Sequence, residues 1–243
     1  MVNLLWTELL KLKRSKMFLL SIIGAAVAPF MVVVASYIYM QTKADVYVAF
    51  EELFYQTNLY TVLVLGVPLY GVVTAYLITR EYMEDTLKNL LTIPVSRTSF
   101  LVSKITLLFT WICLLTFISW ILTLSLGVIF QFEGLTINLL FKSIRQFSSG
   151  AGLLFILSSP IIFVTLVSKN YVPTIIFTIV ITMLNVMGGS SEQRGLFPWA
   201  AAGDISNNTL LPTYDPLVSY LIIACTSLVG FIGSFVYFRR VDI

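Results

Sequence analysis

The chain has 243 residues, of which 58% are hydrophobic and 11% are charged, and it contains no histidine. Soluble domains have about 45–50% apolar and about 25% charged residues, so this composition, with a mean hydropathy of +0.93, is that of a membrane protein. The lack of histidine excludes Ser-His-Asp triads and histidine metal sites. A net charge of +3, scattered along the chain, is too small for a nucleic-acid surface.

Residues 1–16 are predicted to form an amphipathic helix that lies in the lipid headgroup layer. Leu5, Leu9 and Leu12 recur at helical spacing, and Glu8 is expected on the opposite, polar side with the basic residues. Such a helix would act as an interfacial elbow that orients the first membrane span. The alternative is a short charged extension that marks the cytoplasmic side.

Six stretches free of charged residues have about the length needed to cross a bilayer, which is near 20 residues. They are residues 17–40, 59–79, 105–130, 147–167, 171–187 and 217–238. A charged side chain at the centre of a membrane helix costs about 2.5–3.5 kcal/mol on insertion scales, which accounts for this segregation. The sequence therefore predicts an all-α membrane protein with six transmembrane helices in a single transmembrane domain, 1–243. The first span is expected to be retained, because Pro29 follows the one small-residue triplet and the apolar run continues to Met40.

The basic residues beside the spans predict the orientation. One side carries Lys11, Lys13, Arg14, Lys16, Arg80, Lys88, Arg97, Lys104, Lys169, Arg239 and Arg240. The other side carries only Lys43, Lys142, Arg145 and Arg194. By the positive-inside rule the first set is cytoplasmic, which places both termini in the cytoplasm.

The cytoplasmic segment 80–97, between the second and third spans, has the pattern of a short amphipathic helix. Its apolar stripe consists of Met83, Leu87, Leu90 and Leu91, and its charged residues lie elsewhere around the helix. Pro94 is expected to end that helix, and Thr98 or Ser99 to cap the next one. Such a helix suits docking into a groove of a cytoplasmic partner. A solvated linker helix on the membrane surface explains the pattern equally well.

The segments on the outer side are rich in apolar residues. Residues 41–58 and 131–146 are expected to be outer loops that mix charges with aromatic residues. The stretch 188–216 is apolar, is punctuated by glycine and proline, and is too short to cross. It predicts a re-entrant or interfacial segment, with an exposed loop as the alternative.

The sequence argues against chemistry within this chain. It has no Gly-x-x-x-x-Gly-Lys-Ser/Thr phosphate loop. Its predicted spans hold no ionisable residue apart from tyrosine and cysteine, whereas ion-coupled carriers keep such groups at depth. The pair Glu51-Glu52 is not an intramembrane protease motif, because Gln56 stands where arginine is needed and no histidine completes it. Energy for any transport must therefore come from another protein.

Two segments resemble the permease subunits of type-2 ABC exporters. The start, Glu8-Leu-Leu-Lys-Leu-Lys-Arg-Ser-Lys16, is similar to their amphipathic entry helix. The loop Arg80-Glu81, Asp85-Thr86-Leu87, Pro94-Val-Ser-Arg97 and then Lys104 resembles the loop between their second and third spans. The small size and the N-terminal pattern look most like the bacitracin- and lantibiotic-immunity permeases of Gram-positive bacteria.

The resemblance implies a fold, partners and functional residues. It implies a permease in a bacterial plasma membrane that pairs with a second permease chain, identical or homologous, and docks on two ATPase subunits that bind ATP and Mg²⁺. It implies a coupling helix formed by Arg80, Glu81, Glu84, Asp85, Thr86, Leu87, Leu90, Pro94 and Arg97. It also implies that this chain has no catalytic, cofactor or metal site of its own.

The function expected from this resemblance is ATP-driven removal of a bacitracin- or lantibiotic-type peptide from the membrane. Export of a lipid, polymer, other peptide or ion is an alternative. A non-transporting membrane scaffold or sensor is an alternative of another class, which explains the amphipathic loop but not the ordered motif from Thr86 to Lys104.

Overall fold

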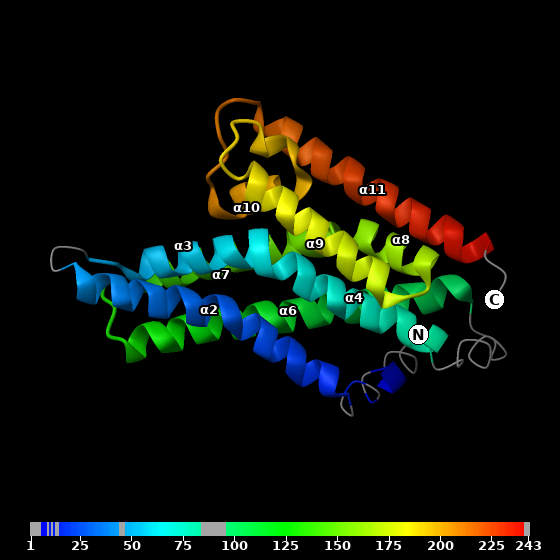
Figure 1. Cartoon of the computed structure of the whole chain (residues 1–243), viewed down its shortest axis with the longest axis horizontal. Helices are drawn as coiled ribbons and strands as arrows, with labels where there is room; N and C mark the ends of the chain where they lie inside the picture. The colour runs from blue at the N-terminus through cyan, green and yellow to red at the C-terminus, as the bar shows by residue number, and fades with distance from the viewer. Residues whose placement is uncertain are drawn as a thin grey trace.

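The computed structural model describes residues 6–8, 10, 12, 15–43, 47–83 and 96–240. These residues form helices and turns without a β-strand, which confirms the all-α prediction (Figure 1). The elements are α2 (Lys16–Thr42), α3 (Phe50–Tyr60), the π-helix η1 (Thr61–Leu65), α4 (Gly66–Met83), α6 (Arg97–Ile129), α7 (Ile137–Ile156), α8 (Ser159–Ser168), α9 (Tyr171–Gly188), the 3₁₀ turn η2 (Arg194–Leu196), α10 (Pro198–Asn207) and α11 (Pro216–Arg240).

Within the described residues, six segments are long and apolar enough to cross a membrane. They are Lys16–Thr42, Phe50–Met83, Arg97–Ile129, Ile137–Ser168, Tyr171–Gly188 and Pro216–Arg240. Five of them contain a whole predicted span, and Arg97–Ile129 covers the predicted span 105–130 except for its last residue. The structure thus bears out six membrane-spanning helices.

The second span is longer than predicted, because α3, η1 and α4 follow one another without a break. Phe50, Leu53, Phe54 and Thr57 are buried at helical spacing, and the acidic pair Glu51-Glu52 occupies the first turn, where the helix dipole favours negative charge. The segment predicted as an outer loop is therefore largely helix from Phe50 onward.

The fourth span is longer than predicted and is broken. It begins at Ile137, within the second predicted outer loop, and α7 gives way to α8 at Leu157 and Ser158. Pro160, in the first turn of α8, has no N–H to continue the hydrogen bonds of α7, so a new helix begins there.

The helices pack along their lengths, with α11 on α8, α9 on α4 and α2 on α6. The α8–α11 contact is close: Ser159 Oγ donates a hydrogen bond of 2.9 Å to the Ser227 carbonyl. A Cβ on Gly230 would lie 2.5 Å from the nitrogen of Pro160, so this crossing requires glycine.

The bundle has two ends, which can be followed in Figure 1. At the base, α2 and α6 begin and α4 and α11 end. At the far end, α2 and α6 end and α3 and α7 begin. Two clusters of buried apolar side chains fill the bundle. The larger includes Tyr70, Trp111 and Leu115, and the smaller, towards the far end, includes Phe50, Phe54 and Phe147.

The stretch 188–216 folds back as a turn, η2 and the short helix α10. Residues Trp199 to Asp204 of α10 are buried, and the helix contacts α7, α11 and α3. A buried helix of 10 residues is too short to span a bilayer. This geometry supports the re-entrant interpretation over an exposed loop.

Candidate functional site

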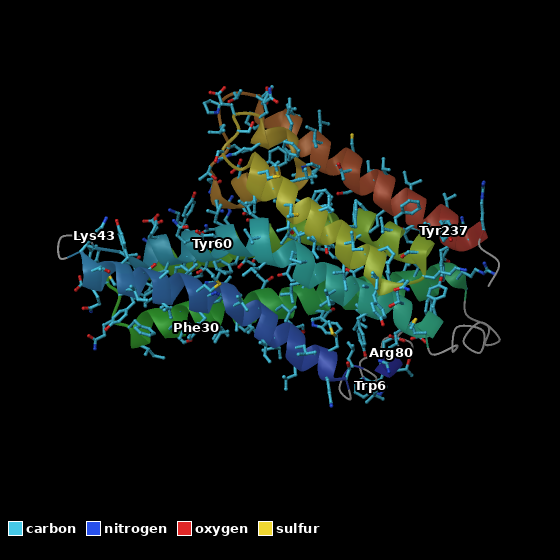
Figure 2. The ribbon with its side chains drawn as sticks, in the orientation of Figure 1. Trp6, Phe30, Lys43, Tyr60, Arg80 and Tyr237 are labelled. Carbon is cyan, nitrogen blue, oxygen red and sulfur yellow. The ribbon has the colours of Figure 1, made fainter. Side chains whose placement is uncertain are left out.

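Three segments meet at the base of the bundle: the N-terminal segment that contains Glu8, the last turn of α4 and the first turns of α6. Ser15 Oγ caps α2 by accepting the Met17 N–H at 3.0 Å. Tyr76 of α4 donates to the same Ser15 oxygen at 2.8 Å and accepts from Arg80 Nη1 at 3.2 Å. These bonds fix the start of α2 against α4. Figure 2 shows Trp6 and Arg80 at this end and Lys43 at the other.

A buried ion cluster holds the three segments together. Lys104 Nζ, on α6, lies 2.7 Å from Glu8 Oε2 and 3.0 Å from Glu81 Oε1. The three residues retain only 3%, 5% and 0% of their exposure. Buried charges are tolerated when they are paired and hydrogen-bonded. One ammonium shared by two carboxylates therefore fastens the N-terminal segment and α4 to α6.

Glu8 was predicted on the polar face of the N-terminal helix, and this prediction is wrong. Glu8 and Leu12 are one helical turn apart and both are buried, whereas Trp6 is exposed. Glu8 turns inward because the Lys104 ammonium compensates its burial. Of the three predicted elbow leucines, Leu12 is buried, and Leu5 and Leu9 lie outside the described residues, so the elbow helix stays a prediction.

The predicted coupling residues fall into two groups. Arg80 and Glu81 lie in the last turns of α4, and Arg97 begins α6, where its Nη1 donates to the Arg239 carbonyl at 3.5 Å. Glu84, Asp85, Thr86, Leu87, Leu90 and Pro94 lie outside the described residues. Glu81 was expected to meet a partner protein. In this structure it is fully buried against Lys104, so any part in coupling would act through α6.

The cap of α6 is also not the predicted one. Ser96 Oγ accepts the Ser99 N–H at 3.1 Å, so Ser96 is the N-cap and Thr98 and Ser99 lie inside the first turn. Helix α6 thus starts at Arg97, three residues after Pro94 in the sequence.

A second charged contact pins the re-entrant segment. Arg194 Nε lies 2.8 Å from Asp204 Oδ2, and Arg194 Nη2 donates to the Thr209 carbonyl at 3.0 Å. Burial raises the pKa of the Asp204 carboxyl above its ordinary value, and the Arg194 guanidinium opposes that rise. Arg194 was predicted only as an outer-side charge, and its pairing with Asp204 joins η2 to α10.

The described residues contain no group of histidine, cysteine, aspartate and glutamate side chains that could hold a metal ion. The hydrogen bonds and ion pairs described at the base join one segment of the chain to another. From this base, α6 runs to the far end of the bundle as one helix of 33 residues.

Comparisons with known proteins identify the family. The family model described as "ABC-2 family transporter protein" matches residues 4–185, a range that includes all three members of the ion cluster. The bacitracin transport permease protein BcrB of Bacillus licheniformis is 55% identical over 199 residues, which cover 82% of this chain and 96% of that protein. The chain therefore belongs to the ABC-2 transporter family.

Proposed function

We propose that this chain is the membrane permease of an ATP-driven exporter that removes bacitracin-type peptides from a bacterial plasma membrane. The observation that carries the proposal is the 55% identity to a bacitracin transport permease over nearly the whole of that protein. The six membrane-spanning helices support it.

Membership of the family implies an ATPase partner. ATP and Mg²⁺ would bind to that partner, since this chain has no phosphate loop. The permease itself would carry no cofactor and catalyse no reaction. We further propose two ATPase subunits per complex and a second permease chain, identical or homologous.

The proposed orientation places the base of the bundle, and with it both termini, in the cytoplasm. Lys16, Arg80, Arg97 and Lys104 belong to the first or last turns of helices at the base. The positive-inside rule assigns such an end to the cytoplasm. The re-entrant segment would then lie near the exit on the outer side.

The segment 80–97 would receive the movement of the ATPase. Its two ends continue directly into α4 and α6, and Lys104 ties both helices to the N-terminal segment. A displacement of the loop would therefore move three elements together instead of bending one.

The test is resistance in a bacitracin-sensitive bacterium that expresses this chain with its ATPase. We expect the pair to raise the inhibitory concentration of bacitracin, and either protein alone to leave it unchanged. A pair whose ATPase carries a substitution of its catalytic glutamate is the control for energy dependence. No protection from an inserted, assembled complex would refute the proposed substrate. Purification without a stoichiometric ATPase would favour a scaffold or sensor.

A further inference from the structure

An open cavity of about 930 Å³ lies towards the far end, among α3, α7, α10 and the start of α11. Its volume is within the range of small-molecule binding sites, which is about 300–1,000 Å³. Charged and polar side chains line it together with Phe141, Ile205 and Tyr220. None of its residues belongs to the ion cluster at the base.

The charges in this cavity are of both signs and are not all neutralised. Lys142 Nζ lies 2.5 Å from Glu51 Oε1, so these two compensate each other. Within the described residues, Arg145 and Glu52 have no oppositely charged partner, although Glu52 Oε1 accepts a hydrogen bond of 2.6 Å from Gln56. The cavity therefore offers one guanidinium from α7 and one carboxylate from α3.

A network of amides forms part of the lining. Asn58 Nδ2 donates to Ser206 Oγ at 3.0 Å and to Asn207 Oδ1 at 2.9 Å, and Gln146 Nε2 also donates to Asn207 Oδ1. With its oxygen occupied twice, Asn207 presents Nδ2 as a buried donor that has no acceptor among the described residues. A buried donor without an acceptor costs about 1–3 kcal/mol. An anionic oxygen of a ligand would remove that cost by accepting the hydrogen bond.

The rim of the cavity is apolar on the α7 side. Phe141 lines the cavity and is 70% exposed, and Ile137, one turn earlier on the same face, is 73% exposed. In a bilayer this stripe would contact acyl chains or the apolar part of a ligand. A molecule that binds here would thus have a polar part inside the cavity and an apolar part along α7.

We propose that this cavity binds the polar part of a zwitterionic amphiphile. Its anionic group would bind to Arg145 and Asn207, and its ammonium group would bind to Glu52. A bacitracin-type peptide is the source that this chain's transport role favours, and that choice rests on the proposed function. A zwitterionic lipid headgroup offers the same chemistry from a second source.

The test uses the full chain with its ATPase in nanodiscs of phosphatidylglycerol, which supplies no ammonium group. Binding of fluorescent bacitracin is titrated without ATP for wild type, Arg145→Gln and Glu52→Gln. The matched controls are Lys43→Gln and Glu192→Gln, which remove like charges from exposed residues that do not line the cavity. We expect each cavity variant to weaken binding by about threefold to tenfold, as for one lost charge-assisted contact, and the controls to bind as wild type.

Acetylated bacitracin, whose amines carry no charge, assigns the two contacts. We expect Glu52→Gln to have no further effect on this probe, while Arg145→Gln still weakens it. If native bacitracin binds to the wild type and both cavity variants bind like their controls, the proposal is overturned.

A repeat with short-chain phosphatidylethanolamine distinguishes the two sources. If the wild type binds no bacitracin but binds this lipid in a manner that depends on Arg145 and Glu52, the peptide function fails and the cavity assignment stands for a lipid. If it binds neither probe, both fail.

Discussion

Lys104→Met should destabilise the protein more than any other single change at the base. Methionine keeps nearly the length and the apolar stem of lysine but removes the ammonium. The buried carboxylates of Glu8 and Glu81, which are 5% and 0% exposed, would then lose the ammonium that lies 2.7 and 3.0 Å from them. Removing one partner from a buried pair costs about 3–5 kcal/mol, because the remaining charge is left uncompensated.

Thermal unfolding in mild detergent measures this cost. For a chain of 150–250 residues, 1 kcal/mol shifts Tm by about 2–4 °C, so we expect a fall on the order of 10 °C. Glu8→Gln is the internal control, because it leaves one ammonium opposite one carboxylate and should cost much less. The triple variant with Lys104→Met, Glu8→Gln and Glu81→Gln should regain stability, because all three members of the ion cluster are then uncharged. If Lys104→Met unfolds like wild type, or the triple variant is no more stable than Lys104→Met, the ion cluster does not hold these segments together.

Three further predictions concern other parts of the chain. Burial raises the pKa of the Asp204 carboxyl, so the folded state binds that proton more tightly than the unfolded state does. The free energy of unfolding should therefore fall as pH rises from the ordinary carboxyl range through the raised pKa. Asp204→Asn should remove that decline from a series of Tm values against pH, and an unchanged slope would contradict the assignment. Gly230→Ala should lower the free energy of unfolding by about 1–3 kcal/mol, because its Cβ would lie 2.5 Å from the backbone of α8. The control Gly152→Ala, whose Cβ would have nothing within 4 Å, should be neutral or stabilise by up to about 1 kcal/mol. Equal effects of the two substitutions would show that the close crossing does not require glycine. Asp85→Ala combined with Leu87→Ala should lower ATP turnover in the assembled complex without loss of membrane insertion, and normal transport by that variant would remove the coupling assignment.

The number of spans could be predicted from the sequence, because each charged residue buried in lipid has its own free-energy cost. The spans therefore stand out as stretches without charged residues. The helix ends could not be predicted in this way. Glu51 and Glu52 interrupt the apolar run, yet they stabilise the first turn of α3 through the helix dipole. Lys142 and Arg145 likewise sit within α7, at the far end of the molecule. A charge therefore marks where a helix can leave the hydrocarbon, and not where the helix ends.

Both sites of interest depend on contacts between distant parts of the chain. Lys104 and Glu8 are separated by 96 residues, and Asn58 and Ser206 by 148. The helical spacing of residues 1–16 predicts a polar face that includes Glu8, because a glutamate without a buried partner is stabilised by water. The available signal was Lys104 itself, a basic residue immediately before a long apolar run. A lysine carried into that helix needs a buried carboxylate, and the sequence alone does not say which one.

The ion cluster at the base is better explained by register than by stability. Apolar side chains of the same volume could fill this space at similar or lower free energy, but they would tolerate sliding of the N-terminal segment along α4. One ammonium between two carboxylates fixes a single alignment of Glu8, Glu81 and Lys104. The proposed role of the segment 80–97 in receiving the movement of the ATPase would need such an alignment, because slippage would dissipate that movement before α6 carried it to the far end. The triple variant separates the two roles: we expect it to unfold nearly as wild type does and to fail in bacitracin resistance, and full resistance would show that packing alone transmits the force.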